Sequence, residues 1–208
     1  MSLATAERAA ICDTLDAVGP DRVTLCTGWT TADLLAHLLV RERQPLAAAG
    51  IMLAPLASVT EKAMRGYATT PWSERVDLLR GGPPLWSPFR IPPLDRLGNG
   101  AELFVHHEDV RRGEPGWSPR PADAERDAEL WALLGRTGRM LYRSSPVGVV
   151  LARPSGERIA AKAGERSVTV TGTPSELVLH AFGRSAVQVE LDGDPADVAA
   201  LGAVSRGV

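Results

Sequence analysis

The sequence has little that would place it in a membrane, on a nucleic acid or outside the cell. No apolar run approaches the ~20 residues that a membrane-spanning helix needs. The first residues carry Glu7 and Asp13 where a secretion signal would have an uninterrupted apolar core. The formal net charge of -2 gives no electrostatic reason to expect a nucleic acid or an anionic membrane as partner. We therefore expect a cytoplasmic protein.

Reactive cysteine pairs and several enzyme motifs are also missing. The chain has only Cys12 and Cys26, which stand far apart without a C-x-x-C motif. This pattern indicates two reduced thiols, and neither is expected to act as a nucleophile. There is no G-x-S-x-G motif of a serine hydrolase, no G-x-G-x-x-G motif of a dinucleotide-binding fold and no phosphate-binding loop.

What the chain does have is a long run of helical patterns. Residues 2–18 repeat apolar side chains at helical spacing, and Gly19-Pro20 ends the pattern. Thr30 and Asp33 have the spacing of a capping box before a helix that is apolar nearly all round from Leu34 to Val40, which predicts a buried helix. Further helices are predicted at about 45–65, 72–80, 99–112 and 121–143.

After Pro146 the pattern changes to that of a small α+β unit. Strands are predicted at 147–151, 158–161, 167–171 and 187–191, and Pro174 and Pro195 each begin a helix. We therefore predict two domains, a helical bundle at 1–145 and an α+β domain at 146–208. The proline-rich segment 81–100 is an irregular connection longer than the usual ~12–15 residues, which suits either a lid or a spacer.

The stretch ELFVHHEDVRR, at 102–112, is rich in ionisable groups for a helix that also carries aliphatic residues. Glu102 and His106 are four residues apart and Asp109 follows three later, so the three share one helix face. Aliphatic neighbours flank that face, so we expect it to turn inward, where a carboxylate needs a metal, an arginine or a histidine as partner. The opposite side holds His107, Glu108, Arg111 and Arg112. We expect His107 to be solvated, and we expect Arg111 and Arg112 either to be solvated or to form salt bridges with Glu108 and Glu114.

His37 stands alone among the leucines of the earlier apolar helix. Together with Glu102 and His106 it could offer two nitrogens and one oxygen to one ion, the three-ligand pattern of catalytic zinc. On spacing alone the sequence favours the alternative, because an E-x-x-x-H motif is common and a lone buried histidine is more often satisfied by a hydrogen bond than bound to a metal. His180, on a later apolar helix, is interpreted as structural.

Three stretches resemble one known family. GWTTADLLAHLLVRE at 28–42 is similar to the first metal motif of the DinB-like, mycothiol-dependent maleylpyruvate isomerase family, and ELFVHHEDVRR is similar to the second. The segment VTVTGTPSELVLHAFGR resembles part of a small sterol-carrier-like domain. The resemblance implies a mainly α fold: a DinB-like four-helix bundle followed by a small α+β domain. The VHHEDVRR ending looks closest to a metal-binding subgroup of the family.

The resemblance also implies a site and an activity. By the match, His37, Glu102 and His106 hold a divalent metal, with Zn²⁺ as first choice, and Asp109 orients a ligand. Mycothiol would be the low-molecular-weight thiol of an isomerase or transferase that acts on a small electrophile. Arg184 either lies near the site or only closes a helix end. A non-catalytic metal- or ligand-binding module and a metal-dependent hydrolase stay open as alternatives, in a monomer or homodimer without nucleic-acid or membrane partners.

Overall fold

The computed structural model describes residues 2–91 and 95–206 and divides them into two compact units at Ser118. The sequence predicts a division near Pro146. The difference arises because helix α8, Ala124–Leu141, packs on a helix and a strand of the second unit. Residues 92–94 of the predicted irregular connection lie outside the described residues. Within the described part of the chain, no helix is long and apolar enough to cross a membrane.

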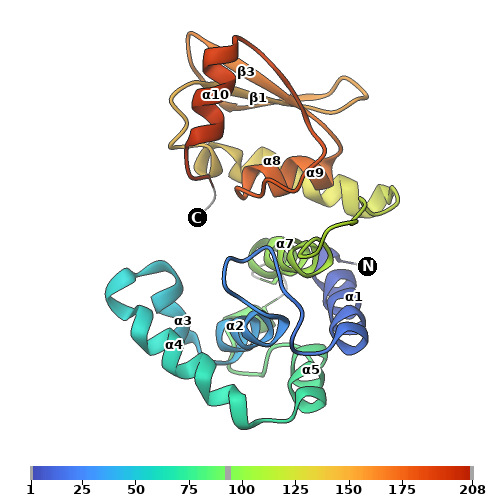
Figure 1. Ribbon diagram of the computed structural model, residues 1–208, viewed down its shortest axis with the longest axis vertical. Helices are drawn as coiled ribbons and strands as arrows, with labels where there is room; N and C mark the ends of the chain where they lie inside the picture. Colours follow the sequence, from blue (N-terminus) through green and yellow to red (C-terminus); the bar gives the residue numbers. More distant parts are fainter. Residues whose placement is uncertain (1, 92–94, 207–208) are drawn as a thin grey trace. The chain divides into compact units, whose positions relative to one another are not determined.

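The first unit is helical (Figure 1). Its predicted helices are confirmed to within a few residues, and the connection after Gly82 contains short 3-10 and π-helical turns. The elements are α1 Leu3–Val18, α2 Thr31–Arg43, α3 Pro45–Met52, η1 Ala54–Leu56, α4 Ala57–Arg65, η2 Gly66–Thr69, α5 Trp72–Arg80, η3 Pro88–Arg90, η4 Asp95–Asn99 and α7 Gly100–Arg111.

The capping residues of α2 fix where that helix begins. The backbone N–H of Thr30 donates to Asp33 Oδ2 at 2.9 Å, as the predicted capping box requires. Asp33 also places a negative charge at the positive end of the helix dipole. The start of α2 in turn sets the angular position of His37, two turns further along.

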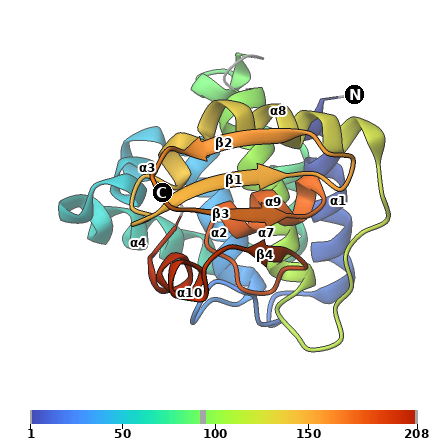
Figure 2. The same cartoon turned by 90° about the horizontal axis from the view of Figure 1, so that it is seen from above.

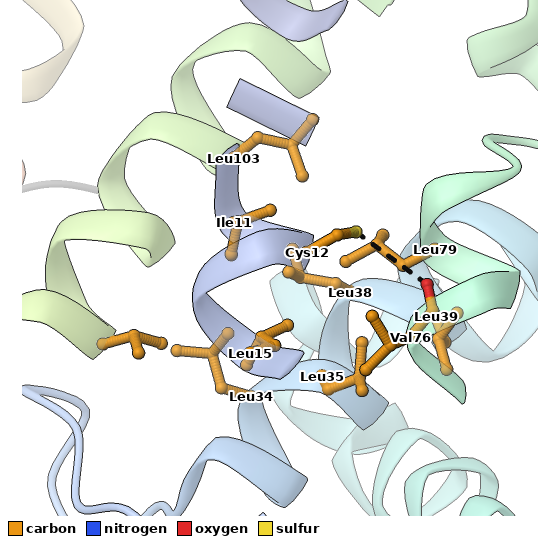
Figure 3. Packing of buried hydrophobic residues seen from close by; sticks show 11 residues of the cluster. Ile11, Cys12, Leu15, Leu34, Leu35, Leu38, Leu39, Val76, Leu79 and Leu103 are labelled. Carbon is orange, nitrogen blue, oxygen red and sulfur yellow. Dashed lines mark hydrogen bonds between the residues drawn. The ribbon is translucent and has the colours of Figure 1, made fainter. Parts of the chain in front are cut away.

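One apolar cluster holds α1, α2, α5 and α7 together. It is built from Ile11, Cys12, Leu15, Leu34, Leu35, Leu38, Leu39, Val76, Leu79, Leu103 and Val110. Figure 3 shows these side chains pointing at one another, with the Cys12 thiol donating to the carbonyl of Val76 at 3.8 Å. Burying each large aliphatic side chain contributes about 1.5–3 kcal/mol. Burial also raises the pKa of Cys12 to about 12, so this thiol is a packing residue.

The second unit is a small α+β unit, as predicted. Its four strands are hydrogen-bonded in the order β2-β1-β3-β4, with β1 parallel to β3 and antiparallel to β2 (Figure 2). Helix α8 packs on α9 and on β2. The elements are α8, β1 Gly148–Ala152, β2 Arg158–Lys162, β3 Ser167–Thr171, α9 Pro174–Ala181, β4 Glu190–Asp192 and α10 Pro195–Ala203.

The fourth strand is shorter than the predicted 187–191. The N–H of Gln188 donates to the buried Glu176 carboxylate at 2.7 Å, and the N–H of Val187 donates to the Ser185 carbonyl at 2.9 Å. These two N–H groups are therefore used locally instead of in a ladder with β3. Pairing with β3 begins only at Glu190, opposite Thr171.

Candidate metal centre

Helices α2 and α7 bring His37, Glu102 and His106 together. One potential ligand atom of each residue lies within 4.8 Å of those of the other two. His106 Nε2 is 3.4 Å from Glu102 Oε2, and the rings of His37 and His106 meet edge to face with centroids 5.1 Å apart. Two ligand atoms held tetrahedrally at about 2.1 Å from one ion lie about 3.4 Å apart. The spacing of the three side chains therefore suits one divalent cation.

His37 lacks the partner that a core histidine normally has. Its side chain is 7% exposed, and no described residue hydrogen-bonds to it; its neighbours are the rings of Trp29, at a centroid distance of 5.2 Å, and His106. Burial, and to a lesser degree the His106 charge, lower the pKa of His37 to about 4. The ring is thus neutral near pH 7, with a lone pair available to a metal ion.

Asp109 sets the orientation of His106. Its Oδ2 lies 3.0 Å from His106 Nδ1, and the carboxylate is completely buried. An ionised carboxylate only accepts hydrogen bonds, so Nδ1 carries the proton and Nε2 faces Glu102. Burial alone would lower the pKa of His106, but its hydrogen bonds to Asp109, with Cys26 and to Glu102 raise it well above its usual value. A cation that binds at Nε2 therefore displaces a proton.

Glu102 supplies the negative charge of the group. Burial would raise its pKa, but the contact with His106 and the charge of Arg41 hold the pKa of Glu102 at about 2. Arg41 Nε lies 3.8 Å from Glu102 Oε2. The donor set is therefore two imidazoles and one ionised carboxylate, which are ligands that Zn²⁺ and similar divalent ions accept.

Arg41 is a residue of the site that the sequence interpretation missed. It lies one turn after His37 on α2, and this i, i+4 spacing was the available signal. Its Nη2 donates to the Gly98 carbonyl at 2.8 Å, its Nη1 donates to the Asn99 side chain, and its guanidinium lies 4.7 Å from the centre of the Phe89 ring. Arg41 thus links Glu102 to the described part of the 81–100 connection.

Residues 1–87 match the model of the mycothiol maleylpyruvate isomerase N-terminal domain. The match confirms the resemblance found in the sequence, and it includes His37 but ends before Glu102 and His106.

Two solved structures share the fold of this chain. The mycothiol-dependent maleylpyruvate isomerase matches with a TM-score of 0.64 and 17% identity, over 92% of this chain and 91% of that one. A histidine-to-alanine mutant of such an isomerase matches with a TM-score of 0.64 and 16% identity, over the same shares. No curated protein matches the chain. Identities this low show a common fold.

His107 lies differently from the sequence prediction. A solvated position was expected, but the side chain is only 4% exposed. Its Nδ1 is 3.1 Å from Glu7 Oε2 and its Nε2 is 2.9 Å from Thr14 Oγ1. The prediction was wrong because α1 packs along α7 and covers the face that a helical wheel leaves to solvent. The two adjacent histidines, His106 and His107, therefore have separate surroundings.

The arginines at the end of α7 were expected either to be solvated or to form salt bridges, and the salt bridges are confirmed. Arg111 and Arg112 both pair with Glu108, at 2.9 and 2.6 Å, as the salt-bridge interpretation predicted. The solvated interpretation was wrong for Arg112, which is buried. Arg112 also lies over the Trp117 ring at 4.4 Å. Glu114, the other expected partner, pairs with Arg22 at 2.6 Å instead.

The second unit contains the two remaining residues singled out from the sequence. His180 is buried and its Nδ1 is 2.7 Å from the hydroxyl of the fully buried Tyr142, in line with its interpretation as structural. Arg184 follows α9, and its Nη1 donates to the carbonyl of Phe182 at 2.8 Å. That bond is the one expected of a cation at a helix end. A role for Arg184 in catalysis stays a prediction.

Proposed function

We propose that the chain binds one divalent cation, with Zn²⁺ as first choice, through His37, Glu102 and His106. We propose further that it uses a low-molecular-weight thiol of the mycothiol type to isomerise a small electrophile or to transfer the thiol to it. The observation that carries the proposal is the convergence of three donor atoms from two helices on a histidine that no described residue hydrogen-bonds.

Each residue of this site has a separate role in preparing it for a cation. His37 is held neutral by burial, Glu102 is kept ionised beside Arg41, and Asp109 holds His106 with Nε2 turned toward the other two donors. Three protein ligands leave a coordination position open, unlike the four ligands of a structural zinc site. A bound divalent ion would lower the pKa of a coordinated thiol, so that a thiolate exists near neutral pH.

Support for the thiol comes from the names of the similar proteins. Both the domain family and the solved structures of the same fold are described as mycothiol-dependent or mycothiol maleylpyruvate isomerase. Addition of the thiol to a double bond followed by its release isomerises the substrate, whereas addition without release transfers the thiol. We interpret the helical unit as a DinB-like bundle and the second unit as sterol-carrier-like, with Arg184 as a candidate substrate contact.

Metal content tests the first half of the proposal. Elemental analysis of untagged protein should find about one metal ion per chain, lost in His106→Gln and kept in His107→Gln. The two substitutions are matched, because the residues are adjacent, buried and on the same helix. Circular dichroism would verify that both variants are folded. Metal lost from His107→Gln and kept by His106→Gln would contradict the assignment.

Measurement of enzymatic turnover tests the second part of the proposal, the thiol-dependent reaction. Metal-loaded protein is mixed with mycothiol and maleylpyruvate, and the products are separated by chromatography. Turnover that needs both the metal and the thiol supports the proposal. Turnover without thiol would favour a metal-dependent hydrolase. A metal-loaded protein without turnover on this and other electrophiles would favour a non-catalytic binding module.

A further inference from the structure

A loop of the first unit holds Cys26 against the far side of His106. Val23 and Thr30 form an isolated antiparallel bridge that closes the loop, and the N–H of Leu25 donates to the Asp109 carbonyl at 3.0 Å. Gly113 packs so closely on Val23 that a Cβ there would collide with the Val23 carbonyl. The loop is thus fastened to the last turns of α7, and the position of the Cys26 thiol follows from these contacts.

The Cys26 thiol completes a second group of donor atoms. Its Sγ lies 3.3 Å from Asp109 Oδ2 and 3.9 Å from His106 Nδ1, and those two atoms are 3.0 Å apart. Around a tetrahedral Zn²⁺, nitrogen and oxygen ligands lie about 3.4 Å apart, and sulfur lies about 3.6 Å from either. Each observed distance is close to the expected one. The three atoms therefore form one face of a tetrahedral site before any ion binds.

We propose that Cys26, Asp109 and His106 Nδ1 form a second cation site that prefers thiophilic ions such as Cd²⁺, Co²⁺ or Zn²⁺. Thiolate, imidazole and carboxylate are a donor set that these ions accept. On binding, the proton of the Cys26 thiol and the proton on His106 Nδ1 both pass to solvent, and His106 Nε2 keeps its own proton. The ion and the two anionic ligands then balance in charge, which offsets the cost of a buried carboxylate.

The two sites compete for one imidazole. A neutral histidine has a single lone pair, so His106 can bind an ion through Nε2, beside Glu102 and His37, or through Nδ1, beside Asp109 and Cys26. Asp109 orients His106 when the first site is filled and becomes a ligand when the second is filled. Cys26 is only partly buried, so an ion can reach the second site from solvent. This inference does not depend on the thiol chemistry proposed above.

Cobalt titration separates the two sites. Co²⁺ in a tetrahedral site absorbs in the visible range, and only a thiolate ligand adds a charge-transfer band in the near ultraviolet. In His37→Ala, which impairs the first site, one equivalent of Co²⁺ should give the charge-transfer band. Glu102→Gln serves the same purpose if His37→Ala does not fold. In Cys26→Ala the band should be absent, and in Cys12→Ala, the control for the other thiol, it should persist.

Each result has a distinct meaning. No charge-transfer band in folded His37→Ala and Glu102→Gln, with both thiols reduced by thiol titration, would overturn the second site. A band that survives in Cys26→Ala would also overturn it. The first site is tested independently, because Cys26→Ala should keep the visible absorption of Co²⁺ bound at His37, Glu102 and His106. Loss of that absorption, with the thiolate band intact in His37→Ala, would contradict the proposed function and leave the second site standing.

Discussion

Each unit of the molecule buries a histidine on an apolar helix, and the two histidines are treated in opposite ways. In the second unit, His180 Nδ1 is hydrogen-bonded to the hydroxyl of Tyr142, at a distance of 2.7 Å. In the first unit, no described residue hydrogen-bonds to His37. Its ring lies against the rings of Trp29 and His106, and donor atoms of Glu102 and His106 are close by. Burial lowers the pKa of both to about 4. Both are therefore neutral near pH 7, but among the described residues His180 has a hydrogen-bond partner and His37 has none.

This difference shows what separates a packing histidine from a candidate ligand. Both histidines have leucines as sequence neighbours, so the sequence around each one predicts the same environment. What differs is the atom placed opposite the ring. A hydroxyl forms a hydrogen bond with His180 Nδ1, whereas a converging carboxylate and a second imidazole leave the lone pair of His37 to a cation.

The largest expected effect is on metal binding. His37→Ala and Glu102→Ala, each combined with Cys26→Ala so that the second site cannot bind an ion, should remove the metal from purified protein, because each deletes one of the three ligands of the first site. His180→Ala should keep the metal, although it costs stability. Elemental analysis and isothermal titration with Zn²⁺ would measure both effects. If His180→Ala lost its metal as fully as His37→Ala while remaining folded, the contrast between the two histidines would be broken.

A smaller effect is expected at the residue behind the site. Asp109→Asn keeps the shape of the side chain but removes the charge that holds His106 Nδ1–H. Loss of such an outer partner typically weakens metal affinity by about 10- to 100-fold. Competition with a chromogenic zinc chelator would measure the change. An unchanged affinity would show that Asp109 has no part in orienting His106.

The stability of the second unit should depend on pH through His180. Burial lowers the folded-state pKa of His180 to about 4, below its ordinary value of 6.5, so the unfolded chain binds more protons between these pH values. The contribution of His180 is fully present above pH 6.5 and is lost as pH falls toward 4. His180→Gln should therefore lose about 2 kcal/mol less stability at pH 4.5 than at pH 7. Urea unfolding at the two pH values tests this, and a pH-independent difference would contradict it.

The smallest effect is expected from Tyr142→Phe. The substitution removes one hydroxyl and leaves His180 Nδ1 without its donor, at a cost of about 1 kcal/mol or somewhat more. Thermal unfolding followed by circular dichroism would detect it. Metal content should not change, because the described structure shows no bond from Tyr142 to any residue of the candidate metal centre. A change in metal affinity without a change in stability would contradict the division of roles.

Helices and their ends were largely predictable from the sequence, while burial of ionisable residues was not. Thr30 with Asp33 marks the start of α2, and Pro174 marks the start of α9, because caps and prolines act within one turn. His107 was misplaced because its partners, Glu7 and Thr14, are about a hundred residues away in the chain. The late start of the β4 pairing, at Glu190, likewise depends on Glu176, a residue of another element.

The candidate metal centre, too, was predictable from the sequence only in part. The E-x-x-x-H spacing by itself determined that Glu102 and His106 share a helix face, because the helix repeat places residues four apart one above the other. Only the tertiary structure decided that His37 faces them, that Arg41 stands beside Glu102 and that Cys26 lies behind His106. These contacts join helices and a loop far apart in the chain, and the packing of α1, α2, α5 and α7 around one apolar cluster brings them together.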